Sequence, residues 1–196
     1  HPRDRRQRQM CIRDRDTPGH KDFAEDTFRT LTAVDSVIVV IDVAKGVEEQ
    51  TEKLVEVCRM RKIPIIVFIN KLDREGKDAF DLMDELESKL GLKVTPLSFP
   101  IGMGYNFKGI YNLWEKNIQI FESTDKQKIA TTIAYDSLES QGLKESIGET
   151  AMSELKECIE LVEGVYPTFE QKEYLEGNLQ PIFFGSALNN FGVQEL

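Results

Sequence analysis

The sequence predicts an α/β fold in which a mostly parallel sheet lies between layers of helices. Short apolar runs rich in β-branched residues alternate with segments of helical periodicity, which is typical of β-α-β units. The clearest apolar runs occupy residues 37–43, 64–69 and 181–187. The 196-residue chain is long enough for one sizeable α/β domain with a small subdomain inserted into it.

Four elements are expected before residue 70. Residues 21–33 predict a helix, because their apolar side chains recur on one side. Residues 37–43, Val-Ile-Val-Val-Ile-Asp-Val, predict a strand that is buried on both faces. Residues 48–61 are amphipathic and predict a second helix, and residues 64–69 predict a second buried strand.

A third helix is expected to begin after Asp78, whose side chain can cap it, and to end at Gly91. Pro and Gly then interrupt short β-like pieces, and a later helical segment over 144–165 is weakened by Gly148. A convincing core strand returns only at 181–187. The chain therefore divides into a basic segment, a domain core, an inserted subdomain and a return to the core, over residues 1–15, 16–91, 92–180 and 181–196.

Composition excludes several functional classes. No apolar run approaches the roughly 18 residues that a membrane span requires, so no membrane partner is expected. Cys11, Cys58 and Cys158 are odd in number and far apart, which argues against a disulfide framework or a zinc site. This cysteine usage favours the reducing cytoplasm, and we expect a monomer there.

The net charge of −9 is unevenly distributed. Residues 1–15 contain six Arg and two Asp, and such an arm could bind nucleic acid, form a solvated tail or be foreign to the domain. Three charged residues, Arg13 to Arg15, stand where a buried strand should precede Asp16. We therefore expect residues 1–15 to be non-native or disordered, and we expect no DNA partner.

The first candidate site follows the strand over 64–69. Asn70-Lys71-Leu72-Asp73 would lie at the carboxyl end of this strand, where open α/β sheets bind ligands. The Asp73 carboxylate could accept hydrogen bonds from N1–H and the exocyclic amine of guanine, whereas adenine presents an acceptor at N1. Asn70 would bridge the base edge and nearby backbone, while the stem of Lys71 would cover the ring. A polar turn without a ligand is the alternative for this tetrapeptide alone.

A second motif, Asp16-Thr17-Pro18-Gly19-His20, strengthens the guanine-nucleotide interpretation. Asp16 could hold Mg²⁺ through a water, because Mg²⁺ keeps most of its waters and takes few protein carboxylates. Gly19 would let a backbone N–H approach a γ-phosphate, and His20 could orient an attacking water in phosphoryl transfer. The whole pentapeptide is thus expected to contact GTP or GDP, with His20 as the catalytic residue.

A third motif, Ser186-Ala187-Leu188, follows the strand residues 182–185. A turn at this point can aim the Ala187 N–H at the O6 atom of guanine. The tripeptide is a weak signal by itself, and its order after the other two motifs makes it a credible third part of the GTP site.

Taken together, these motifs resemble those of the translational GTPases, and most closely those of bacterial peptide chain release factor 3. The Asp-Thr-Pro-Gly-His form is shared by elongation factors and their relatives. Longer stretches carry the narrower resemblance: residues 25–35, 42–48, 70–74, 99–102 and 183–193.

The resemblance covers about residues 16–196 and implies a three-layer G domain of the P-loop NTPase type with an inserted subdomain. It implies a ribosome-dependent GTPase of translation termination, which helps to dissociate class I release factors from the ribosome. The implied partners are ribosomal RNA, ribosomal proteins and a class I release factor, and the implied cofactor is Mg²⁺. Ribosomal contact would place His20 for hydrolysis.

One departure from the family pattern bears on activity. The sequence contains no Gly-x-x-x-x-Gly-Lys-[Ser/Thr] phosphate loop, and we expect the chain to lack the amino-terminal strand, this loop and the first switch. Phosphate contacts supply much of nucleotide affinity, so we expect weak or no GTP binding and no turnover by this chain alone. The alternatives are a fragment of an elongation-factor-G-like translocase and a non-catalytic pseudo-GTPase interaction module.

Overall fold

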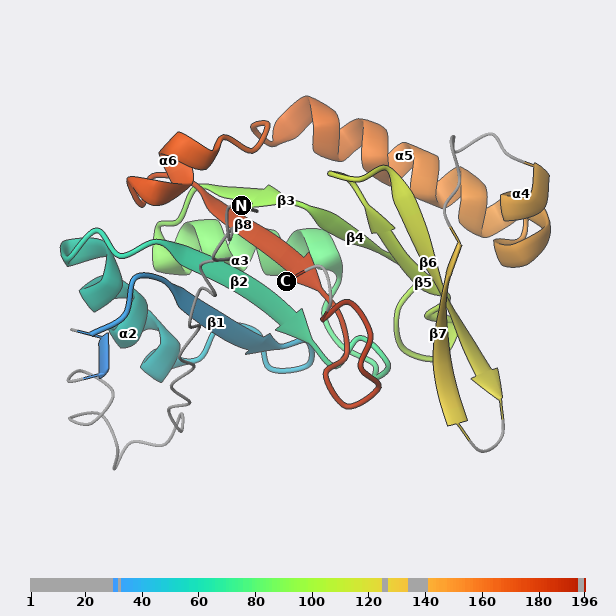
Figure 1. Cartoon of the computed structure of the whole chain (residues 1–196), viewed down its shortest axis with the longest axis horizontal. Coiled ribbons are helices and arrows are strands. Elements are labelled where there is room, and N and C mark those ends of the chain that lie inside the picture. Colours follow the sequence, from blue (N-terminus) through green and yellow to red (C-terminus); the bar gives the residue numbers. More distant parts are fainter. Residues whose placement is uncertain (1–29, 32, 125–126, 134–140, 194–195) are drawn as a thin grey trace, which may run out of the picture. The chain divides into compact units, whose positions relative to one another are not determined.

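The computed structural model describes residues 30–31, 33–124, 127–133, 141–193 and 196 (Figure 1). The side chains of residues 121–141 and of residue 143 are not described. The chain divides into two units, residues 1–34 and 35–196, and every element below belongs to the second unit. The predicted basic segment over 1–15 lies outside the described residues, as does most of the predicted helix over 21–33.

A four-stranded parallel sheet forms the first part of this unit. Its strands are β1 (Val37–Asp42), β2 (Ile65–Asn70), β8 (Gln180–Phe184) and β3 (Val94–Pro96), in that spatial order. Each neighbouring pair is parallel. The last strand in the sequence, β8, thus lies between β2 and β3. The parallel pairing confirms the predicted α/β fold with a parallel sheet.

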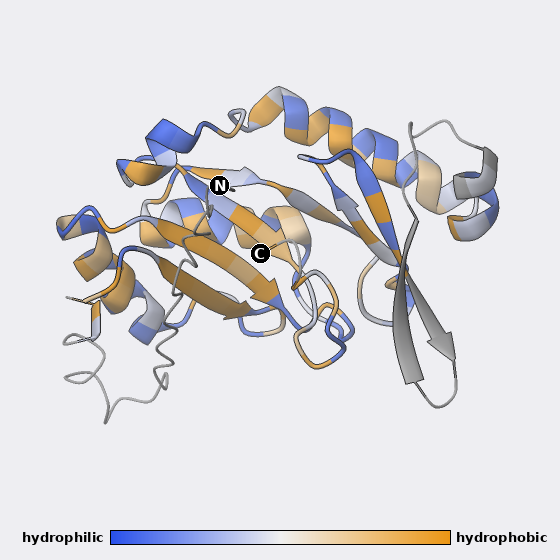
Figure 2. Cartoon of the chain, in the orientation of Figure 1, coloured by the Kyte–Doolittle hydropathy of each residue, from blue (hydrophilic) through white to orange (hydrophobic). Residues whose placement is uncertain are grey.

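The two inner strands of this sheet, β2 and β8, each have a neighbouring strand on both sides. Both strands are apolar along most of their length (Figure 2), and all five residues of β8 are buried. The strand β1 differs, since Ile38 and Val40 are 51% and 57% exposed. The prediction that this strand is buried on both faces is therefore wrong: β1 is an edge strand of the described sheet, and the side chains of Ile38 and Val40 are more than half exposed.

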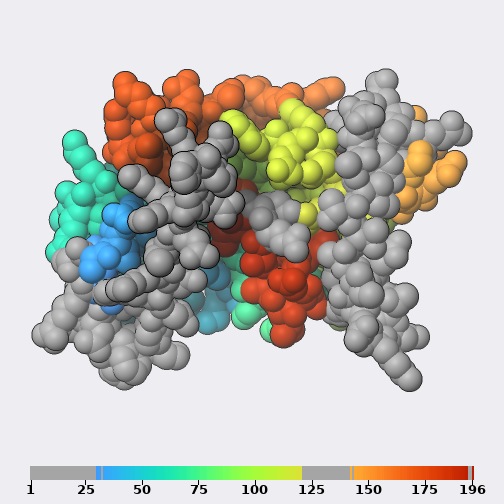
Figure 3. Space-filling model, viewed as in Figure 1, coloured from blue at the N-terminus to red at the C-terminus, as the bar shows by residue number. Residues whose placement is uncertain are grey.

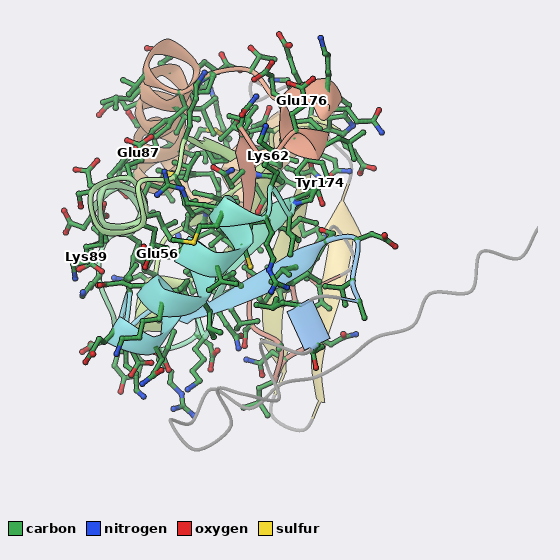
Figure 4. The ribbon with its side chains drawn as sticks, turned by 90° about the vertical axis from the view of Figure 1, so that its left-hand side faces the viewer. Glu56, Lys62, Glu87, Lys89, Tyr174 and Glu176 are labelled. Atoms are coloured by element: carbon green, nitrogen blue, oxygen red, sulfur yellow. The ribbon has the colours of Figure 1, made fainter. Side chains whose placement is uncertain are left out.

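Two helices, α2 (Glu49–Met60) and α3 (Ala79–Leu90), pack side by side on one face of this sheet. Figure 4 shows Glu56 of α2 and Glu87 and Lys89 of α3 on the outer surface of this layer. The inner face of α3 is apolar, and burying each of its large side chains stabilises the fold by about 1.5–3 kcal/mol. The buried residues of α3 are Ala79, Leu82, Met83, Leu86 and Leu90.

Both predicted ends of α3 are confirmed. The Asp78 side chain accepts a hydrogen bond from the Phe80 N–H at 2.8 Å, which caps the first turn. Gly91 has a φ of 59° and ends the helix in the left-handed conformation that glycine adopts readily.

A second, antiparallel sheet follows β3 in the sequence. It contains β4 (Ser98–Ile101), β5 (Gly109–Asn112), β6 (Asn117–Thr124) and β7 (Gln127–Ile133) in that order, with a short 3₁₀ turn, η2 (Gly104–Asn106), between β4 and β5. The strand β3 lies within residues 92–180, the predicted insertion, yet it belongs to the parallel sheet. The first residue of β4, Ser98, still contacts the parallel sheet, because its hydroxyl accepts a hydrogen bond from the Phe184 N–H of β8 at 2.9 Å.

Three helices occupy the stretch before β8: α4 (Gln141–Ile147), α5 (Glu149–Val165) and α6 (Gln171–Leu175). Gly148 has a φ of 85° and separates α4 from α5, so the helix predicted over 144–165 is two helices. The buried stripe of α5 consists of Met152, Leu155, Ile159 and Val162. In the part of the chain that the structure describes, no helix has the length and apolar character needed to cross a membrane.

Candidate functional site

Two of the three predicted motifs lie in the described part of the chain. Asn70 ends β2 and Lys71 to Asp73 follow it, while Ser186 to Leu188 follow β8. Asp16, Thr17, Pro18, Gly19 and His20 lie outside the described residues, so their predicted roles stay predictions.

The two described motifs lie next to each other because their strands are neighbours. Phe68 pairs with Phe183 and Ile69 with Phe184 in a parallel ladder, so both strands end at the same edge of the sheet (Figure 1). The ladder continues past the strand ends, where the Gly185 N–H donates to the Ile69 carbonyl at 2.9 Å. The carboxyl edge of a parallel sheet is where such folds bind ligands.

The Asn70 side chain joins the two turns. Its Oδ1 accepts hydrogen bonds from the backbone N–H of Lys71 at 2.8 Å and from that of Ala187 at 2.9 Å. The Ala187 N–H, predicted to face the O6 atom of guanine, thus donates to Asn70 in this structure. A ligand that uses the same N–H would have to share it with Asn70.

The Asp73 carboxylate is joined to the second turn. The Ser186 hydroxyl donates to its Oδ1 at 2.6 Å, and the Asn189 Nδ2 donates in turn to the Ser186 hydroxyl at 3.0 Å. Ser186 is 1% exposed, whereas Asp73 is half-buried. An ionised carboxylate offers about four lone-pair directions, so Asp73 can accept further hydrogen bonds while it holds Ser186.

Lys71 makes a contact that the sequence did not predict. Its Nζ lies 2.5 Å from Asp42 Oδ2, and its φ of 69° is left-handed. The hydrogen bond from Lys71 holds the pKa of Asp42 below its ordinary value, and the N–H of Ala44 also donates to this carboxylate. The Lys71 side chain is 42% exposed, so its stem remains available to a ligand that lies above the strand ends.

Leu72 and Leu188 occupy opposite environments. Leu72 is fully buried, its N–H donates to the Gly185 carbonyl at 3.2 Å, and its carbonyl accepts from the Gly104 N–H at 3.0 Å. Leu72 therefore anchors the first turn to the core, between Lys71 and Asp73. Leu188 is 79% exposed.

The second turn is held by a small loop over residues 186–191. Ser186 and Phe191 exchange backbone hydrogen bonds at 2.9 and 3.0 Å, and the buried Phe191 ring packs edge-on against Phe107 with centroids 5.3 Å apart. Gly185 has no room for a side chain, since a Cβ there would lie 2.3 Å from the Phe191 carbonyl oxygen. Figure 3 shows the segment after β8, in red, at the molecular surface.

Sequence reasoning missed two residues of this site, Asp42 and Asn189. Asp42 could have been suspected, because it ends the apolar run of β1 at the strand end that pairs with Asn70. Asn189 carried no signal, since a polar residue in a loop is ordinary and its contact depends on the shape of the 186–191 loop.

The arrangement presents a carboxylate, a side-chain amide and a lysine stem at one sheet edge, which suits a planar base that carries adjacent N–H donors. No group of three or more His, Cys, Asp or Glu residues that could hold a metal ion occurs among the residues with described positions. The predicted magnesium contact therefore depends on Asp16, which lies outside them.

In a comparison with protein-family models, the model described as the elongation factor Tu GTP binding domain matches residues 7–196, nearly the whole sequence.

Proposed function

This chain belongs to the elongation factor Tu GTP-binding domain family, and from that membership we propose that Asn70–Asp73 and Ser186–Leu188 form the part of its site that recognises guanine. The chain is a GTP-binding domain of the translation-factor type. The observation that carries the proposal is the pair of hydrogen bonds between the two turns, from Ser186 to Asp73 and from Ala187 to Asn70.

Asp73 is the residue that distinguishes guanine from adenine in this proposal. Its carboxylate accepts from N1–H and from the exocyclic amine of guanine, and both hydrogen bonds are strengthened by the charge of the carboxylate. Adenine offers a lone pair at N1, which would face the carboxylate without a proton between them. Such a mismatch leaves a polar group unpaired and is costly in a partly buried site.

The other described residues support the base. Asn70 fixes the relative position of the two turns, and the Lys71 stem covers one face of the ring. The Ala187 N–H is shared between Asn70 Oδ1 and the O6 atom of the bound guanine. Leu72 and Leu188 contribute backbone position and an apolar wall, respectively.

Hydrolysis is assigned to the motif outside the described residues. We place Asp16 as the residue that would hold Mg²⁺ through a water, and the ion would neutralise phosphate charge during phosphoryl transfer. Gly19 would donate its N–H to the γ-phosphate, with Thr17 and Pro18 shaping the turn, and His20 would orient the attacking water.

For the cellular role, we propose translation termination in the cytoplasm. The support is the resemblance to bacterial peptide chain release factor 3 in five stretches of sequence, which include Asn70 to Arg74 and residues 183–193. In this role the parent protein would act on the ribosome in its GTP-bound form and help to dissociate a class I release factor. A ribosome-dependent GTPase assay on the parent protein, with and without a class I release factor on the ribosome, tests this role. Stimulated translocation in place of release-factor dissociation would assign the chain to the elongation-factor-G-like alternative.

The phosphate-binding part of the site is not supplied by the described residues. The sequence contains no Gly-x-x-x-x-Gly-Lys-[Ser/Thr] motif, and base recognition alone gives a weak complex. We propose that the 196-residue polypeptide binds GDP more weakly than about 1 μM, which corresponds to about 8 kcal/mol of binding free energy.

Titration with fluorescent GDP tests this statement. The 196-residue polypeptide is compared with a version extended at its amino terminus by a strand and a phosphate loop from the parent protein. We expect tight binding only in the extended version. Micromolar or tighter binding by the 196-residue polypeptide would contradict the proposal, and equal weak binding by both would favour the non-catalytic interaction module.

A further inference from the structure

We propose that Asn189 is a positioning residue for guanine recognition, which acts on Asp73 through the Ser186 hydroxyl. The inference rests on the proposed function and adds a residue that neither the motifs nor the family match assigns. Its basis is a chain of two hydrogen bonds, from Asn189 Nδ2 to Ser186 Oγ at 3.0 Å and from Ser186 Oγ to Asp73 Oδ1 at 2.6 Å.

The direction of this chain follows from the number of protons available. An ionised carboxylate can only accept, so the short contact between Ser186 and Asp73 requires the Ser186 hydroxyl proton to point toward Asp73. A hydroxyl has one proton, so its oxygen must then accept from Asn189. The amide nitrogen of Asn189, and not its oxygen, therefore faces Ser186.

The loop fixes Asn189 in this position. Its backbone N–H donates to the Ser186 carbonyl at 3.2 Å, so both the backbone and the side chain of Asn189 return to the same residue. Ser186 is itself tied to Phe191 by two backbone hydrogen bonds, and Phe191 is fully buried. The donor that faces Ser186 is thus held by the fold before any ligand binds.

Asn189 consequently restrains the rotation of the Asp73 carboxylate. With Oδ1 occupied by Ser186, rotation of the carboxylate is restricted, and its other lone pairs remain free to accept from a ligand. A preorganised acceptor loses less conformational freedom when guanine binds. Because hydrogen bonds polarise one another along a chain, donation from Asn189 also strengthens the bond from Ser186 to Asp73.

An Asn189→Asp substitution separates this role from simple space filling. An ionised aspartate has nearly the same shape as asparagine but cannot donate a hydrogen bond. The Ser186 hydroxyl could then donate either to Asp73 or to the new carboxylate at position 189. The added negative charge would also lie close to Asp73, one hydroxyl away. We expect the preference for GDP over ADP to fall about tenfold, as for the loss of one hydrogen bond to a charged group. We expect a fall of about threefold for Asn189→Ala, because water can take the place of the lost amide.

The matched control is Asn190→Asp, the same chemical change one residue later. Asn190 is exposed and has a φ of 50°, a conformation that Asp tolerates nearly as well as Asn. This variant changes the net charge by the same amount, and we expect it to leave the preference for GDP unchanged.

The experiment titrates the 196-residue polypeptide and its three variants with GDP and with ADP up to millimolar concentrations. NMR chemical shifts monitor binding and give the affinity for each nucleotide. Thermal unfolding of each variant checks that the fold is kept. A lower ratio of GDP to ADP affinity in Asn189→Asp, with Asn190→Asp like the wild type, is the expected result. An unchanged ratio in Asn189→Asp, or an equal fall in both Asp variants, would overturn the inference alone. A wild-type polypeptide without any preference for GDP would overturn the proposed function and this inference with it.

Discussion

Asp42 and Lys71 form an ion pair at the ends of two neighbouring strands, β1 and β2. The pair is partly exposed, with 42% of the Lys71 side chain and 18% of the Asp42 side chain accessible. Asp42 also accepts from the Ala44 N–H, so its carboxylate joins the loop after β1 to the first turn of the site. The ion pair therefore contributes both to stability and to the position of Lys71.

We predict that Asp42→Asn lowers the free energy of unfolding by about 0.5–1 kcal/mol, as measured for partly exposed ion pairs. Urea unfolding at neutral pH measures the change. The control is Glu49→Gln, which removes an exposed ion pair with Lys53 on α2, where both side chains are more than half exposed. We expect almost no change in the control, and an equal effect of both substitutions would contradict the assignment.

For single residues, the sequence predicted that the two described motifs lie close together, but it did not predict every hydrogen-bond and ion-pair partner of their side chains. The closeness of Asn70 and Asp73 to Ser186 and Ala187 follows from strand order and motif chemistry. The contact from Lys71 to Asp42 could not be predicted, because it depends on the register between β1 and β2. The same limit applies to Asn189, whose role depends on the path of one short loop.

The loop over residues 186–191 is the element on which the second turn depends. It closes tightly on Gly185, where an added Cβ would lie 2.3 Å from the Phe191 carbonyl oxygen and 2.8 Å from the Phe68 ring. Backbone cannot move aside as a flexible side chain can, so the loop must open if a side chain is added here.

We predict that Gly185→Ala lowers the free energy of unfolding by about 1–3 kcal/mol, the usual range for overpacking. NMR should also show a change at the Ala187 amide, since its hydrogen bond to Asn70 depends on the loop. Gly164 is the control, because it lies in α5 and a Cβ there would meet nothing within 4 Å. Gly164→Ala should stabilise the helix by about 0.5–1 kcal/mol. A Gly185→Ala variant as stable as the wild type would show that the loop is not tightly closed.

The strand β1 is the element whose environment differs most from its sequence pattern. Its β-branched run is as apolar as that of β2, yet Ile38 and Val40 are more than half exposed. An exposed apolar edge strand can pair with another chain and promote aggregation.

We predict that Val40→Lys reduces aggregation of the 196-residue polypeptide at equal concentration, measured by light scattering during mild heating. Met60→Lys, on the exposed side of α2, makes the same change of charge away from a strand edge, since Met60 is 74% exposed. Only Val40→Lys should slow aggregation substantially. Equal slowing by both would assign the effect to net charge.

At the scale of elements, the sequence predicted the helices and inner strands well, because periodicity and capping residues are local signals. Asp78 and Gly91 at the ends of α3 are the best example. The pairing of β3 with β8 and the break between α4 and α5 were not predicted. The first depends on contacts across more than eighty residues, and the second on the left-handed conformation of Gly148.

Within the second unit, the carboxylate of Glu85 links segments that are distant in sequence. Lys77 and Glu85 form an ion pair, and Glu85 Oε2 accepts from the Val47 N–H at 3.1 Å, which ties the loop after β1 to α3. The hydrogen bond from Lys77 is the main cause of a pKa of Glu85 below its ordinary value. Asp42 has a lowered pKa for a similar reason.

These two carboxylates predict how stability depends on pH. A carboxyl group whose pKa is lower in the folded state stabilises the fold above its unfolded pKa of about 4, and the stabilisation is lost as the pH falls through the folded pKa. The free energy of unfolding should therefore be level near pH 6–7 and fall below about pH 4. Urea unfolding from pH 7 to pH 3 measures this profile. Glu85→Gln should make the acid decline shallower, and an unchanged slope in this variant would contradict the role of the pair.

The central claim for the molecule is that Asp73 distinguishes guanine from other bases, and an Asp73→Asn substitution tests it most directly. Xanthine carries a carbonyl where guanine carries its exocyclic amine, so the amide of asparagine could donate to xanthine where the carboxylate accepted from guanine. NMR titration of the wild type and the variant with GDP and with xanthosine diphosphate compares the two bases. The wild type should prefer GDP, and the variant should lose about tenfold or more in GDP affinity and prefer xanthosine diphosphate. The same order of preference in both proteins would contradict the claim.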